Sequence, residues 1–154
     1  MKPSQKELND FVLDLVEFMG KHFASRFDKT RVAGGNEGVS IRIRRAESDS
    51  ELEITTDRLD PYIAFGKTHW HYHPYMGSKE ELFARIQSDL TAVFMDRLVV
   101  VGGSKGEAFM GGISFRNVSD EEAIGDYRGR TPGCTEITLK KWTRPESVHP
   151  FSDP

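Results

Sequence analysis

The chain has 154 residues, 37% of them hydrophobic, and this length suits one domain with a single core. Its 21 basic and 24 acidic residues give a net charge of −3, which argues against a general nucleic-acid or membrane-surface binder, since such proteins usually carry excess positive charge. No stretch approaches the roughly 18 apolar residues of a membrane span, and one cysteine, Cys134, excludes an intramolecular disulfide.

The first predicted element is a helix over 4–27. It begins with a capping box, Ser4 to Glu7, in which the serine hydroxyl accepts from the glutamate N–H and the glutamate side chain reaches back. Apolar residues then recur at steps of three and four, so they form one stripe along the helix. The glycine-rich segment 34–38 predicts a loop after it.

Three strands are predicted next. Apolar and polar residues alternate over 39–44 and over 51–55, which is typical of half-buried strands paired as an antiparallel hairpin. A third strand is expected over 62–73, and which of its faces is buried stays open. An uninterrupted strand places three histidines on the face of Ile63, whereas a bulge at Gly66 reverses the alternation and leaves them on the open face.

The second half of the chain predicts another helix and more strands. A second capping box, Ser78 to Glu81, begins a helix that ends near Met95. Four consecutive apolar residues over 98–101 are typical of a strand covered on both faces. The remaining expected elements are strands over 109–115 and 135–142 and one helical turn over 119–124.

These elements together define the expected fold. Strands joined by short turns favour antiparallel pairing over βαβ crossovers. The sequence therefore predicts an α+β fold, in which an antiparallel sheet of five or six strands carries two amphipathic helices packed on one face. We expect this single domain to span 1–143 and a proline-rich flexible tail to span 144–154.

A row of histidines is the strongest chemical signal, in the segment Thr68-His69-Trp70-His71-Tyr72-His73. Alternate side chains of a strand share a face about 6.5–7 Å apart, and imidazoles at that spacing can hold one Zn²⁺ if the strand twists. His69, His71 and His73 are therefore candidate metal ligands. The competing interpretation is a solvated or partner-binding surface, because a metal site also needs a fourth group and hydrogen-bond partners that hold each imidazole.

A small zinc-dependent hydrolase is accordingly the alternative function, with zinc as cofactor and Glu51, Glu53 or Glu81 as general base. The segment His71-Tyr72-His73-Pro74 is similar to the histidine pair of the JAMM metalloproteases. It departs from that family because Ser78 follows too closely and the acid is Glu81 where the family has Asp.

A second resemblance covers more of the chain. The segment 62–72 reads Tyr-Ile-Ala-Phe-Gly-Lys-Thr-His-Trp-His-Tyr and is followed by a helix, by the strand 96–101 and by a glycine-rich hairpin. Over 60–115 this order resembles small bacterial immunity proteins of polymorphic toxin systems. The resemblance implies a non-enzymatic binder of a protein, with no cofactor.

The leading expectation is a small cytoplasmic protein-binding domain without catalytic residues, which covers the active surface of a protein toxin or of another protein. Nucleic acid and membranes are not expected partners, no signal-peptide pattern follows Met1, and assembly of identical chains stays open. Aromatic anchors are typical of binding hot spots. The candidates are Trp70, Tyr72, Tyr75 and Trp142, and the alternative for each is a place in the core, which Trp70 and Tyr72 take if the alternation reverses at Gly66.

Overall fold

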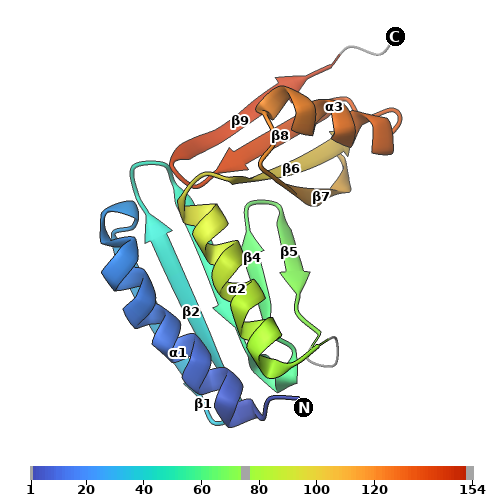
Figure 1. Ribbon diagram of the computed structural model, residues 1–154. Helices are drawn as coiled ribbons and strands as arrows, with labels where there is room; N and C mark the ends of the chain where they lie inside the picture. Colours follow the sequence, from blue (N-terminus) through green and yellow to red (C-terminus); the bar gives the residue numbers. More distant parts are fainter. Residues whose placement is uncertain (1, 74–76, 152–154) are drawn as a thin grey trace.

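The structure is a computed structural model that describes residues 2–73 and 77–151. In these ranges the chain forms two antiparallel sheets and three α-helices (Figure 1), which confirms the α+β class. The first sheet has five strands in the order β1-β2-β3-β4-β5, and the second has four in the order β7-β6-β8-β9. No helix in the described part of the chain is both long and apolar enough to cross a membrane.

The first sheet is a meander, because its strands follow one another along the chain. They are β1 (Lys29–Gly35), β2 (Gly38–Arg45), β3 (Ser50–Thr55), β4 (Tyr62–Phe65) and β5 (Thr68–His71). The accompanying helices are α1 (Gln5–His22) and α2 (Lys79–Phe94), with short 3-10 turns η1 (Ala24–Arg26) and η2 (Asp57–Leu59).

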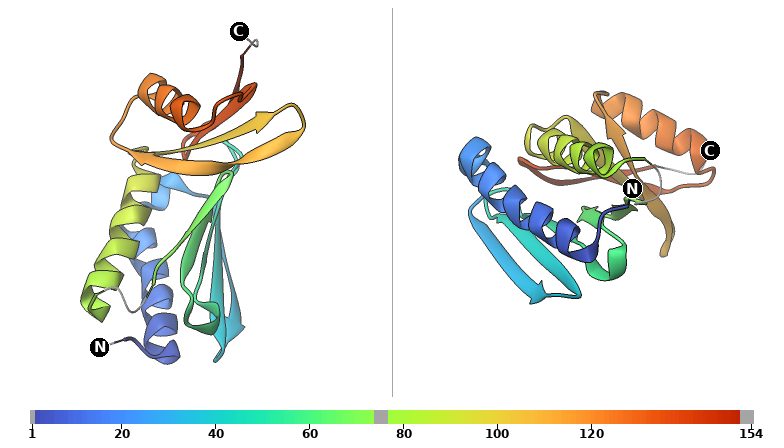
Figure 2. Two further views of the ribbon diagram at one scale, coloured as in Figure 1. Left: turned by 90° about the vertical axis from the view of Figure 1, so that its right-hand side faces the viewer. Right: turned by 60° about the horizontal axis from the view of Figure 1, so that its bottom comes forward.

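Both helices cover one face of this sheet, as predicted (Figure 2). Each begins with its capping box: the N–H of Glu7 donates to Ser4 Oγ at 3.1 Å, and the N–H of Glu81 donates to Ser78 Oγ at 3.2 Å. Burying one large apolar side chain contributes about 1.5–3 kcal/mol, so the layer between helices and sheet dominates stability. Its fully buried members include Leu15, Met19, Ile41, Ile43, Leu52, Ile54, Ile63 and Leu90.

The second sheet lies across one end of the first (Figure 2). Its strands are β6 (Leu98–Lys105), β7 (Ala108–Arg116), β8 (Glu136–Lys141) and β9 (Arg144–Pro150), and α3 (Asp120–Arg130) covers one of its faces. Val99 and Val101 pack beneath α3, whereas Leu98 and Val100 belong to the core of the first sheet. The strand 98–101 is therefore covered on both faces, as its apolar run predicted.

The residues at the end of β8 join the two sheets. Trp142 is fully buried against Phe94, with ring centroids 4.9 Å apart, and its Nε1–H donates to the carbonyl of Arg26 at 2.5 Å. Lys140 is also buried, and its ammonium donates to the Ser48 carbonyl at 2.9 Å and to Ser50 Oγ at 2.6 Å. Of the two alternatives for Trp142, an exposed anchor or a core residue, the structure shows the second, because the core of the first sheet encloses it.

Two expectations about the chain's course are also corrected. Arg144–Pro150, expected as part of a flexible tail, forms β9 and pairs with β8, while 152–154 lie outside the described residues. Proline is compatible with this strand because β9 is the edge of its sheet. The segment 34–38, expected as a loop, contains the end of β1 and the start of β2, and only 36–37 form the turn.

Candidate binding surface

One face of the first sheet has no helix over it in the ranges 2–73 and 77–151 (Figure 2). Along each strand its side chains alternate with those of the core, so the sheet has one buried and one open side. We call this side the uncovered face. Its side chains on β2 to β5 are Arg42, Arg44, Glu51, Glu53, Tyr62, Ala64, His69 and His71.

The hairpin of β4 and β5 places the histidines on the uncovered face. The chain reverses at 66–67, where Gly66 has a φ of +61°, and Ile63 then pairs with Trp70 across the hairpin. The expected single strand over 62–73 is therefore wrong, because a tight turn interrupts it. The consequence for His69 agrees with the alternative in which the alternation reverses at Gly66.

The structure brings two of the three candidate metal ligands together. The rings of His69 and His71 lie 5.2 Å apart, and Nδ1 of His71 lies 2.8 Å from a carboxylate oxygen of Asp60. His73 lies two residues beyond the end of β5 and is exposed. Among the described residues, no group of three or more His, Cys, Asp or Glu side chains is arranged to hold a metal ion.

Two of the three candidate general bases lie on the uncovered face, and the third lies at the start of α2. Glu51 and Glu53 are on the uncovered face, where Glu53 forms an ion pair with Arg42 at 3.2 Å. Glu81 belongs to the capping box at the start of α2, where its carboxylate accepts from the N–H of Ser78 at 2.9 Å. Since α2 covers the opposite side of the sheet, Glu81 is separated from the histidines.

The aromatic candidates Trp70 and Tyr72 join the sheet to α2. The indole N–H of Trp70 donates to Tyr72 Oη at 2.7 Å and to the carboxylate of Asp89 at 3.2 Å, and the Tyr72 hydroxyl also donates to Asp89. Burial raises the pKa of the Tyr72 phenol, and the charge of Asp89 raises it further.

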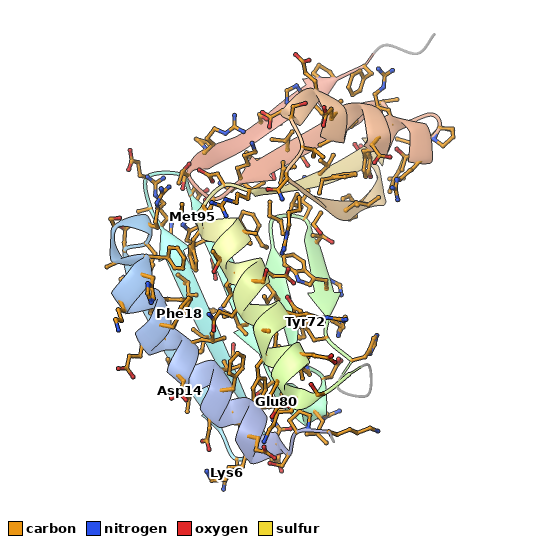
Figure 3. The ribbon with its side chains drawn as sticks, in the orientation of Figure 1. Lys6, Asp14, Phe18, Tyr72, Glu80 and Met95 are labelled. Atoms are coloured by element: carbon orange, nitrogen blue, oxygen red, sulfur yellow. The ribbon has the colours of Figure 1, made fainter. Side chains whose placement is uncertain are left out.

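Tyr72 lies beside α2 in Figure 3. Tyr72 is buried and Trp70 is half-buried, which agrees with the alternative that places them in the core and not with a role as exposed anchors. The physical reason is the reversal at 66–67, which turns both rings towards the core. Tyr75 lies outside the described residues.

The uncovered face carries a basic cluster, of which the sequence indicates only the β2 half, since Arg42 and Arg44 share one face of the predicted strand 39–44. Lys29 lies directly opposite Arg44 and Arg31 directly opposite Arg42 across the pair of β1 and β2, and all four side chains are exposed. Together with Glu51 they line a depression. We call these four residues the basic cluster. The β1 half of the cluster was not predicted, because β1 is exposed on both sides and so lacks the alternation that marks a strand.

Acidic neighbours neutralise only part of this cluster. Arg42 pairs with Glu53 at 3.2 Å and Arg44 with Asp49 at 3.5 Å. Lys29 and Arg31 form no ion pair within the described part of the chain. The β1 side of the uncovered face therefore keeps a net positive charge, although the whole chain is acidic.

Comparison of the chain with protein-family models, with curated proteins and with solved structures finds no match. The similarity to immunity proteins over 60–115 stays a prediction. The function is therefore argued from the geometry of the site.

Proposed function

We propose that this chain is a non-enzymatic protein-binding domain that recognises an acidic surface of its partner through the uncovered face of the first sheet. The basic cluster is the observation that supports this proposal. In the narrower form that the sequence resemblance implies, the partner is a bacterial toxin and the complex forms in the cytoplasm.

The basic cluster is unfavourable for folding by itself. Like charges directly opposite each other on neighbouring strands destabilise a sheet, whereas opposite charges contribute about 0.2–1 kcal/mol per pair. Two such like-charged pairs, Lys29 with Arg44 and Arg31 with Arg42, lie side by side. An acidic partner surface would remove this repulsion, and the positive potential would also speed its approach.

Zinc-dependent hydrolysis is the second candidate, and one observation favours it. The carboxylate of Asp60 lies against Nδ1 of His71, which is how imidazoles that bind metal through the other nitrogen are commonly oriented. A catalytic zinc site as a rule has three protein ligands. Only His69 and His71 adjoin each other in the described ranges, so protein binding is the better supported function.

Charge reversal on the uncovered face tests the proposal. The variant Lys29→Glu/Arg31→Glu reverses the two cations of the basic cluster that form no ion pair with any described residue. Its matched control, Lys21→Glu/Arg85→Glu, reverses two exposed cations on α1 and α2, which cover the other face. Both variants replace two positive charges by two negative ones, so only the location of the change differs.

Affinity capture from the native cells then compares the three proteins. Wild type and the α1/α2 control are expected to retain the same protein, and the β1 variant is expected to lose it. Retention of that protein by the β1 variant, or equal loss from both variants, would contradict the proposal. Stoichiometric zinc and a hydrolytic activity, both lost in His69→Ala/His71→Ala, would favour the hydrolase instead.

A further inference from the structure

β1 is the outer edge of the first sheet, and all seven of its residues are exposed. It pairs with β2 alone, so in the described ranges no strand pairs with the backbone N–H and C=O groups of its outer edge. Asn9 Nδ2 donates to the carbonyl of Gly35 at 3.1 Å, which occupies only the end of β1 next to the turn. Such an edge is a template on which an extended segment can add as a further strand.

The two sides of this edge differ in chemistry. On the uncovered face, β1 presents Lys29 and Arg31 of the basic cluster. On the opposite side α1 leaves β1 exposed, and the side chains of Leu13 and Val32 are 42% and 48% exposed in one groove between α1 and β1. Lys29 and Arg31 therefore offer positive charge on one side of the strand, whereas Val32, together with Leu13, offers an apolar contact on the other.

We infer that β1 accepts an extended segment of the partner protein as a sixth strand, in which acidic side chains alternate with apolar ones. This inference rests on the proposed function and specifies the chemistry of the partner. The acidic side chains would face the basic cluster, and the apolar ones would lie in the groove beside Leu13 and Val32. One segment can make both contacts because successive side chains of a strand point to opposite faces.

Two other occupants fit the edge less well. A second copy of this chain, added antiparallel through its own β1, would place another Lys29 and Arg31 on the same face of the joined sheet and would offer these cations no acidic side chain from β1. A nucleic acid would leave the backbone groups of β1 unpaired, and its phosphates would meet the carboxylates of Glu51 and Glu53 on the same face. An acidic peptide segment uses both the charge and the backbone of the edge.

The experiment uses the full chain and three synthetic seven-residue peptides that are capped at both ends and carry a fluorophore. The first alternates Glu and Val, the second has the same composition with the Glu residues grouped, and the third has Lys in place of Glu. Fluorescence anisotropy titrations measure each affinity. We expect the alternating acidic peptide to bind at least about tenfold more tightly than either of the others.

Methylation of the peptide backbone identifies strand addition. Only every second N–H of an added strand points towards β1, so N-methylation of one alternate set is expected to reduce affinity at least about tenfold while methylation of the other set leaves it unchanged. The variants Lys29→Glu/Arg31→Glu and Val32→Asp are expected to weaken binding of the alternating peptide. The control Lys21→Glu/Arg85→Glu is expected to bind it as wild type does.

Several results would overturn the inference. Absence of peptide binding, equal affinity for the alternating and grouped acidic peptides, or equal effects of the two methylation sets would exclude strand addition. Tighter binding of a single-stranded oligonucleotide than of the alternating peptide would assign the edge to nucleic acid. Each of these results leaves the proposed function standing if partner capture still depends on Lys29 and Arg31 and not on Lys21 and Arg85, so the failure of the inference and the failure of that function are distinguishable.

Discussion

Tyr72 is buried on the side of the first sheet that the helices cover, away from the proposed binding surface. Its hydroxyl donates to the carboxylate of Asp89 on α2, and Arg116 pairs with the same carboxylate. We expect Tyr72→Phe to lower the free energy of unfolding by about 1–3 kcal/mol, because a buried hydrogen bond to a charged group is lost. Urea unfolding measures this change.

The same variant is expected to keep full affinity for the partner, measured per folded molecule, because Tyr72 lies on the helix side of the sheet. A loss of affinity without a loss of stability would show instead that Tyr72 reaches the partner. Such a result would support the role of Tyr72 as a binding anchor, for which the sequence made it a candidate.

The sequence identified the histidine row but not its surroundings. His69 and His71 stand out because they alternate, yet their side of the sheet depends on whether the chain turns at Gly66. That turn depends on pairing between β4 and β5 and on packing against the second sheet, and the alternation of residues along 62–73 reveals neither of them. The same holds for Trp70, which an apolar pattern alone cannot assign to a partner or to α2.

Gly66 allows the tight turn that joins β4 to β5. Its φ of +61° is costly for residues with a side chain, and an added Cβ would lie 3.1 Å from Cγ1 of the buried Val100. Gly106 has almost the same φ, +60°, and open space around it. Gly106→Ala is therefore a matched control that carries the conformational cost alone, about 1–2 kcal/mol.

We expect Gly66→Ala to destabilise the protein more than Gly106→Ala does, because the added Cβ would crowd the buried side chain of Val100. Thermal unfolding of both variants compares them directly. Equal losses of stability would mean that the second sheet does not press on the turn, and that the hairpin forms independently of it.

Among the helices and strands, those with a buried apolar side were predicted from the sequence, whereas the largely exposed strands β1 and β9 were not. α1 and α2 were predicted because a capping box and an apolar stripe are both local signals. β1 was not predicted because all of its residues are exposed. β9 was not predicted because it contains prolines, which a strand tolerates at the edge of a sheet, and its edge position depends on pairing with β8. The β1 half of the basic cluster was therefore not predicted either, because Lys29 and Arg31 join Arg42 and Arg44 only when β1 lies beside β2.

At the scale of the whole molecule, Lys140 holds the two sheets together at an electrostatic cost. Burial lowers the pKa of its ammonium, whose neighbours Ser48 and Ser50 contribute only neutral oxygens. A folded-state pKa below that of the unfolded chain means that the unfolded chain binds the proton more tightly. Stability is therefore expected to rise with pH between the lowered pKa and the ordinary value of 10.5.

This pH dependence is measured against Lys140→Met. The free energy of unfolding of the wild type is expected to gain on that of the variant as the pH rises towards 10.5, because only the wild type loses the buried charge. Parallel curves for the two proteins would show that the ammonium is hydrated in the folded chain.

The central claim is that the basic cluster serves a partner and not the fold. The most direct measurement is the free energy of unfolding of Lys29→Glu/Arg31→Glu, which converts two repulsive cross-strand pairs with Arg44 and Arg42 into attractive ones. We predict that urea unfolding shows this variant to be more stable than wild type by about 0.5–2 kcal/mol. A variant less stable than wild type would contradict the claim, because the cations would then be contributing to the fold itself.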